Sequence, residues 1–124
     1  MNDDTLLLRQ IHPSFVQGGR VTSQAFTPTP KDDRQLSTYD GDQISASAAF
    51  DHYTTQINCQ SFGVYAVRVG ECRELQLEVR ADPEPYPEHV VIDFGDRPPK
   101  AIKSVGKALR EKAVARGWQH QGSQ

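Results

Sequence analysis

The chain has 124 residues, of which 36% are hydrophobic and 24% charged, and its formal net charge is −2. This length suits one domain, and the composition excludes a wholly disordered chain, a collagen-like repeat and a coiled coil. We therefore expect a single domain over residues 1–118, followed by a flexible C-terminal tail over residues 119–124.

No stretch of the sequence approaches the ~18 consecutive apolar residues that a transmembrane helix needs. The first four residues, Met-Asn-Asp-Asp, are acidic where a secretory signal would be basic. Together these observations predict a cytoplasmic protein, and its compact size favours a bacterial source.

The N-terminal region predicts two short strands followed by a long loop. Residues 6–11 form an apolar run, and residues 20–26 alternate in a way compatible with a strand that has one mostly polar face. With Gly18-Gly19 between them, the two segments are candidates for a β-hairpin. Residues 27–41 contain two prolines and three aspartates, and we expect a loop there.

The middle of the chain predicts a small helix and three strands. Ser45 is positioned to cap a helix over residues 46–56, because serine accepts hydrogen bonds from the first N–H groups of a helix. Residues 62–69 and 89–94 are apolar enough for buried strands, and residues 77–80 for a short edge strand.

The clearest element is a helix over residues 99–116, which opens with proline and stops before Gly117. Its apolar residues fall on one stripe at helical spacing, which indicates a core-facing side. Taken together, the elements predict an α+β domain. We expect a small, mostly antiparallel sheet of three to five strands, a short helix, and a long C-terminal helix packed on one sheet face.

Charge is distributed unevenly along the sequence. Residues 1–96 carry a balance of −8, whereas residues 97–124 carry a balance of +6. Four cations of the C-terminal helix share one stripe, and these are the candidate partner-binding residues Lys100, Lys103, Lys107 and Arg110. Such a stripe suits an acidic protein partner, and we interpret the chain as a non-catalytic interaction or regulatory subunit.

Two other interpretations of the cationic stripe remain open. It can be an ordinary solvated helix face opposite the core, or it can bind nucleic-acid phosphates. The overall pI near 6.0 and the lack of an aromatic stacking set beside the stripe disfavour nucleic acid. We rank a protein partner first, a solvated face second and nucleic acid third, and we expect no membrane contact.

A second functional hypothesis is a small phosphate-handling or nucleic-acid-processing enzyme. Its candidate catalytic residues are His12 as general acid or base, Arg20 and Lys31 as phosphate or oxyanion contacts, and Asp32 as the orienting carboxylate. The competing interpretation of this region is a turn followed by a hydrophilic loop.

The sequence contains no motif for a metal or a cofactor, and we expect neither. The four histidines are scattered and form no His-x-x-His or His-x-x-x-His pair. Cys59 and Cys72 are isolated, which predicts two reduced thiols.

Overall fold

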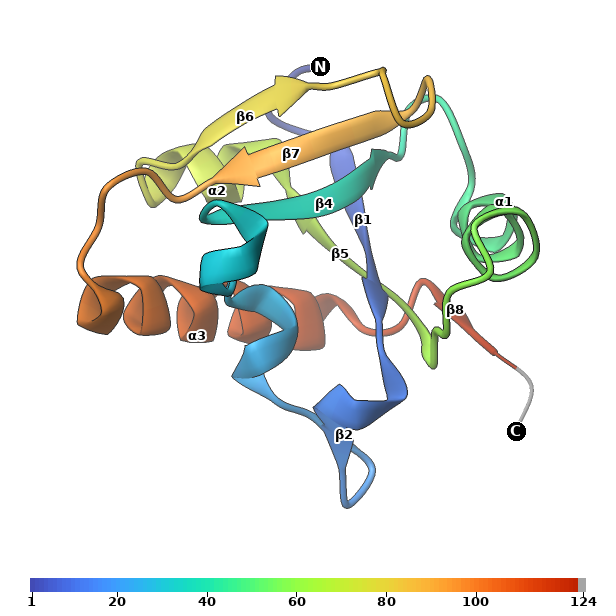
Figure 1. The fold of residues 1–124 in the computed structure, drawn as a ribbon, viewed down its shortest axis with the longest axis horizontal. Coiled ribbons are helices and arrows are strands. Elements are labelled where there is room, and N and C mark those ends of the chain that lie inside the picture. Colours follow the sequence, from blue (N-terminus) through green and yellow to red (C-terminus); the bar gives the residue numbers. More distant parts are fainter. Residues whose placement is uncertain (123–124) are drawn as a thin grey trace.

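Six strands form one antiparallel sheet in the order β6-β7-β4-β1-β5-β8, and two very short strands pair as a separate ribbon (Figure 1). This computed structural model describes residues 1–122, the side chain of Pro30 excepted. It confirms the predicted α+β class, with a sheet larger than the expected three to five strands. The strands are β1 (Leu6–Ile11), β2 (Val16–Gln17), β3 (Arg20–Val21), β4 (Gln35–Asp40), β5 (Gly63–Arg68), β6 (Glu78–Ala81), β7 (His89–Asp93) and β8 (His120–Gln121).

Three α-helices and several short helical turns connect the strands. The expected Ser45 cap is present, because its Oγ accepts the Ala48 N–H at 3.1 Å. The helix that follows changes to a π-helical turn for its last five residues. The helices are α1 (Ala46–Asp51), α2 (Val69–Glu74) and α3 (Pro99–Arg116), with 3-10 turns η1 (Pro13–Phe15), η2 (Ser23–Phe26) and η3 (Pro30–Asp32) and the π turn η4 (His52–Gln56).

The predicted strand over residues 20–26 is wrong beyond its first two residues. Only β3 pairs, and it pairs with β2, while β1 lies between β4 and β5. The remainder forms η2, in which the consecutive residues Ala25 and Phe26 are both fully buried. Successive residues of a strand point to opposite faces, so a helical turn is what allows both side chains to enter the same core.

The predicted loop over residues 27–41 is also wrong, because its second half is the central strand β4. This strand pairs with β7 over five residues and with β1 over two. Its polar side chains find partners inside the sheet: the Thr38 hydroxyl donates to the Val90 carbonyl at 2.8 Å, and Ser37 Oγ lies 3.0 Å from His89 Nε2. Those partners come from distant sequence, so local composition did not indicate a strand.

The predicted C-terminal tail begins beside a short strand of the sheet. His120–Gln121 pair with β5, where the sequence predicts fraying. Trp118 packs this segment against β5, because its ring stacks on that of Tyr65 with centroids 3.9 Å apart. Residues 123–124 of the predicted tail lie outside the described residues.

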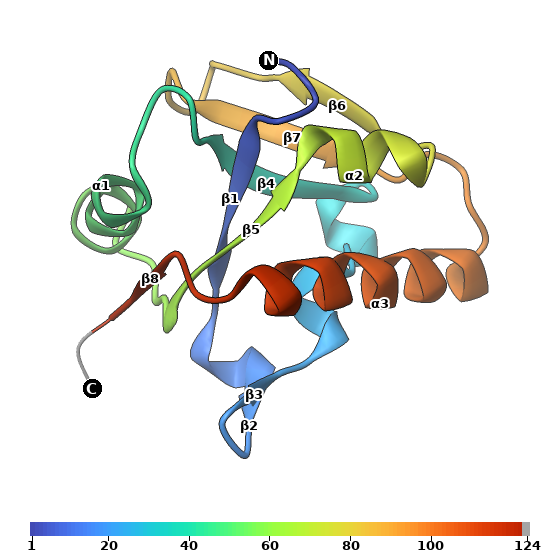
Figure 2. The same ribbon diagram turned by 180° about the vertical axis from the view of Figure 1, so that it is seen from behind.

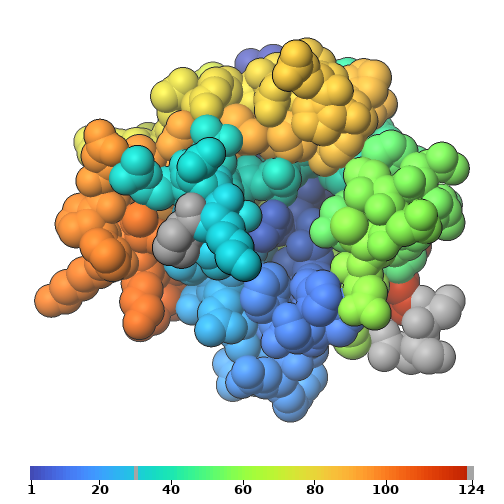
Figure 3. All heavy atoms as spheres, in the orientation of Figure 1, coloured from blue at the N-terminus to red at the C-terminus, as the bar shows by residue number. Residues whose placement is uncertain are grey.

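The two faces of the sheet are covered differently. Helices α2 and α3 cover one face (Figure 2), where Leu7, Ile11 and Val67 belong to the larger core. On the other face, Leu8 and Tyr39 pack against α1 in a smaller cluster. This second face is covered only in part, and the space-filling view shows a hollow there (Figure 3).

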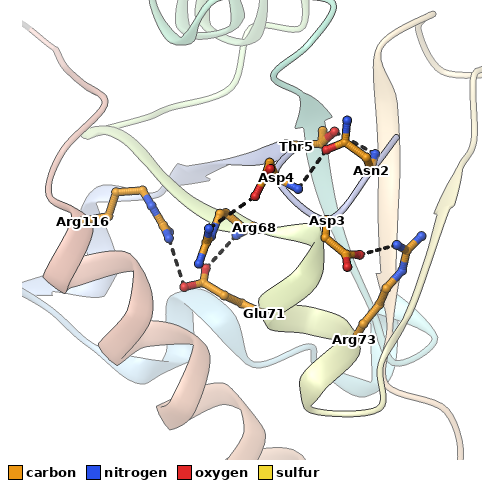
Figure 4. A network of polar contacts seen from close by, with 8 residues as sticks. All are labelled: Asn2, Asp3, Asp4, Thr5, Arg68, Glu71, Arg73 and Arg116. Carbon is orange, nitrogen blue, oxygen red and sulfur yellow. Dashed lines mark hydrogen bonds and ion pairs between the residues drawn. The ribbon is translucent and has the colours of Figure 1, made fainter.

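A largely buried ion pair between Glu71 and Arg116 connects the C-terminal end of α3 to α2 (Figure 4). Arg116 also connects α3 to β5. Glu71 Oε2 accepts from Arg116 Nη2 at 3.0 Å, and Glu71 Oε1 accepts the backbone N–H of Arg68 at 2.7 Å. Arg116 Nη1 donates to the Ala66 carbonyl at 2.9 Å. Burial by itself would raise the pKa of Glu71, but these hydrogen bonds outweigh burial and hold that pKa below its ordinary value.

The same network continues to the N-terminal segment through exposed ion pairs. Arg73 contacts Asp3, and Arg68 Nη1 lies 3.5 Å from Asp4 (Figure 4). Exposed pairs contribute little, about 0–1 kcal/mol each. The Glu71–Arg116 pair, with side chains 8% and 22% exposed, is therefore the energetically important member of this network.

Candidate binding grooves along the C-terminal helix

Helix α3 has the predicted bounds and lies close against η2. Leu109 and Ala113 are fully buried, and Gly117 ends the helix with a φ of +91°. Gly106 is the point of closest approach. A Cβ at this position would collide with the Thr27 hydroxyl and lie 3.1 Å from the Phe26 carbonyl oxygen.

Replacing Gly106 with alanine should therefore destabilise the protein. Alanine gains about 1 kcal/mol of helix propensity over glycine, but overpacking costs about 1–3 kcal/mol. We expect the free energy of unfolding, measured in urea, to fall by up to about 2 kcal/mol. Ser104→Ala on the exposed side of the same helix is the control. A net stabilisation in Gly106→Ala would contradict the close contact.

The first groove runs between the N-terminal half of α3 and the segment that joins η2 to β4. Its volume is about 720 Å³, within the range of ligand-binding clefts. The apolar part of its lining includes the prolines at 28 and 99 and Ile102, and cationic side chains surround that part. All lining residues are Thr27, Pro28, Thr29, Asp33, Arg34, Arg97, Pro99, Lys100, Ile102 and Lys103.

The cations of the first groove differ in how firmly they are held. Arg97 donates to the carbonyls of Phe94, Leu75 and Gln76, so its guanidinium serves the fold. Arg34 pairs with Asp96 at 3.3 Å, but both side chains are more than half exposed, so this pair exchanges easily with another anion.

The two lysines of the first groove are the groups available to a partner. Lys100 and Lys103 are exposed, and neither forms an ion pair with any residue that the structure describes. They are three residues apart, so they project as neighbours from one side of α3.

The second groove adjoins the same helix farther along, beside β3. Its volume is about 390 Å³, and the other two residues of the predicted stripe, Lys107 and Arg110, line it together with Arg20. Arg110 Nε donates to the Val21 carbonyl at 2.8 Å, so Arg110 is held to the body of the protein. The predicted stripe thus borders two grooves instead of lying on a plain outer face.

Electrostatically, the two grooves form one cationic strip along α3. Seven arginines and lysines line them, against the two carboxylates Asp33 and Glu111. Arg34 and Arg97 were not anticipated from the sequence, because they precede the helix and reach the strip only through the folding of the loops. Arg97 stands directly before Pro98-Pro99, and that proximity to the helix start was the one available signal.

The four candidate catalytic residues lie on three segments: His12 precedes η1, Arg20 begins β3, and Lys31 and Asp32 belong to η3. The His12 Nδ1 accepts the Ser14 N–H at 3.0 Å at the start of η1, and Lys31 is exposed on η3. Asp32 accepts hydrogen bonds from the backbone and hydroxyl of Thr29.

Only Arg20 of these four lines either groove. Within the described part of the chain, no hydrogen bond or ion pair joins any two of them. The catalytic grouping of His12, Arg20, Lys31 and Asp32 stays a prediction.

The two cysteines and the possible metal ligands were located in the described residues. Both cysteines are free, as predicted, and burial raises the pKa of the Cys72 thiol to about 12. Within residues 1–122 no three histidine, cysteine or acidic side chains gather in a way that could hold a metal ion. No helix in that range has the length and apolar character required to cross a bilayer.

Comparison with known proteins gives no assignment. The chain matches no protein family, no curated protein and no solved structure.

Proposed function

We propose that this protein is a non-catalytic interaction or regulatory subunit of a cytoplasmic, bacterial system, and that it docks an acidic segment of a partner protein along α3. The observation that carries the proposal is the combination in the first groove of an apolar lining with two exposed lysines at its edge. A partner segment with an apolar anchor and flanking carboxylates complements both features.

The apolar part of the groove argues against a merely solvated helix face. The charges of a solvated helix face are surrounded by water. In the first groove, by contrast, the buried Pro28 and the half-buried Ile102 line the same cleft as the two lysines. Binding energy at protein interfaces comes chiefly from such anchors, and rim charges mainly steer the encounter. The proposal therefore assigns affinity to the groove and orientation to Lys100 and Lys103.

The charge of the whole molecule favours a protein partner over nucleic acid. The cationic strip belongs to a chain of net charge −2, whose first 96 residues carry a balance of −8. That acidic body repels a polyanion from most directions of approach. The linings of the two grooves also contain no aromatic side chain on which a base could stack.

The test uses a synthetic helical peptide that carries leucines on one face and glutamates beside them. For the double variant Lys100→Glu/Lys103→Glu we expect about tenfold weaker binding, mostly through slower association, because rim charges act on the encounter rate. Fluorescence anisotropy and stopped-flow mixing measure the two quantities. A peptide with its leucines replaced by serines should bind weakly to the unmodified protein.

The matched control is Lys112→Glu, an exposed lysine on the same helix that lines neither groove. This variant should bind the peptide like the unmodified protein. Equal binding by all three proteins would show that the strip is a solvated face. Tighter retention of a DNA duplex than of the peptide, with a salt slope of about 0.9 per phosphate contact, would assign the strip to nucleic acid instead.

A further inference from the structure

The hollow on the second sheet face lies away from α3 and takes no part in the proposed docking. In Figure 3 it is bordered by the cyan, yellow, green and blue segments of the chain, and its visible floor has the dark blue and teal of β1 and β4. These two strands pair only through Leu7↔Asp40 and Leu8↔Tyr39 and then separate (Figure 1). The hollow therefore lies over a gap in the sheet.

Arg9 fills that gap. Its Nε donates to the Ala25 carbonyl at 2.9 Å in a part-buried bond, and its Nη1 donates to the Ser37 carbonyl at 3.0 Å in a solvent-exposed bond. The Nε side of the guanidinium is thus part-buried, whereas its Nη1 side is exposed to solvent. Of its five N–H groups these two bonds use two, which leaves hydrogens on the Nη1–Nη2 edge for another acceptor.

The charge of Arg9 is not neutralised by a neighbouring carboxylate. Among the described residues it forms no ion pair. Burial lowers its pKa, and the nearby side chains of Tyr53, Asp32 and Tyr86 oppose that effect. An arginine stays charged even when buried. A desolvated cation with free donors favours an external anion.

Tyr53 and Tyr86 are half-buried aromatic side chains near this cation. Tyr86 stacks on the fully buried Tyr39 with ring centroids 4.6 Å apart, and the Tyr39 hydroxyl lies 2.8 Å from His52 Nδ1. Burial raises the pKa of Tyr86 to about 12, so its phenol stays protonated and can donate a hydrogen bond. Tyr53 belongs to the same apolar cluster.

We propose that this hollow binds a small aromatic carboxylate, with Arg9 as the anion contact and with Tyr53 and Tyr86 as the wall against the ring. A planar carboxylate matches the two-pronged edge of a guanidinium. A single negative charge matches the single cation, whereas a phosphate dianion would place extra charge near Asp32. The aromatic wall selects a flat, apolar body.

The probe is benzoate, titrated by NMR and calorimetry into the full chain, with benzamide as its uncharged analogue of equal shape. We expect saturable benzoate binding that shifts tyrosine ring resonances, and binding at least tenfold weaker for benzamide and for inorganic phosphate. Arg9→Gln should weaken benzoate binding at least tenfold. Arg73→Gln, which replaces an exposed arginine of α2 on the opposite sheet face, should bind like the unmodified protein.

Several outcomes would overturn the site. They are no saturable binding of benzoate, equal binding of benzoate and benzamide, tighter binding of phosphate, or unchanged affinity in a folded Arg9→Gln. If Arg9→Gln does not fold, two other measurements still test the site. The first is the comparison of benzoate with benzamide on the unmodified chain, and the second is Tyr86→Phe, which should weaken benzoate binding severalfold. Lys100→Glu/Lys103→Glu should bind benzoate normally, so this proposal and the docking of an acidic segment fail independently.

Discussion

Replacing Glu71 with glutamine should lower the free energy of unfolding by about 3 kcal/mol, since removing one partner of a buried ion pair costs roughly 3–5 kcal/mol. We expect the lower end of this range because the Arg116 side chain is 22% exposed and keeps some hydration. The loss arises mainly from Arg116, which would stay near the core without its counter-charge. Equilibrium unfolding in urea measures the change.

The matched control is Glu74→Gln, on the same helix but exposed, which should change the free energy of unfolding by less than about 0.5 kcal/mol. Equal effects of the two substitutions would contradict the role assigned to the buried pair.

The same pair predicts a pH dependence. The pKa of Glu71 in the folded protein lies below its ordinary value, so the unfolded chain binds the proton more readily. The contribution of Glu71 to stability is therefore complete above the ordinary value of 4.5 and disappears as the pH falls through the lower folded value. The stability difference between the unmodified protein and Glu71→Gln should accordingly shrink below about pH 4.5. A difference that stays constant down to pH 3 would contradict this assignment.

Replacing Leu109 with alanine should cost a comparable amount, about 2–5 kcal/mol, as typical for a fully buried leucine. Leu109 is 0% exposed and belongs to the larger core, where it joins α3 to the sheet and to η2. The substitution removes buried apolar surface and leaves a cavity in the layer that positions the two grooves.

Val114→Ala is the control for Leu109→Ala, because Val114 is on the same helix and 38% exposed. It should lower the free energy of unfolding by less than about 1 kcal/mol. If Leu109→Ala has no greater effect than Val114→Ala, the packing of α3 on the sheet is not what stabilises this fold.

The two proposed sites use opposite faces of the sheet and different kinds of chemistry. The grooves along α3 offer exposed lysines over an apolar lining, which suits an extended protein surface. The hollow offers one partly buried arginine beside tyrosines, which suits a small molecule. Because both sites reach the same sheet, the benzoate and peptide titrations should also be run together. If bound benzoate changes the affinity for the peptide, bound peptide must change the affinity for benzoate by the same factor.

Several elements could be predicted from the sequence because their signals are local. The bounds of α3 follow from Pro99, Gly117 and a regular apolar stripe, and the structure reproduces them. Strands β1, β5 and β7 follow from short apolar runs, and the cap of α1 follows from Ser45. The lysines along α3 could also be identified, because helical spacing alone places them on one side.

The tertiary structure decided what depends on distant partners. Strand β4 is polar in sequence and becomes the central strand because β1 and β7 supply its hydrogen bonds. The first groove exists because the segment before β4 folds beside α3.

The environment of Arg9 is the clearest case of this division. In the sequence Arg9 is one charged residue in an apolar strand. In the folded protein β1 separates from β4 beside Arg9, which donates to the carbonyls of Ala25 in η2 and Ser37 in β4. Tyr53 and Tyr86 lie near its charge, and it forms no ion pair among the described residues. A sequence pattern records which side chains a local element presents, whereas the desolvation and pairing of a charge depend on what long-range folding brings around it.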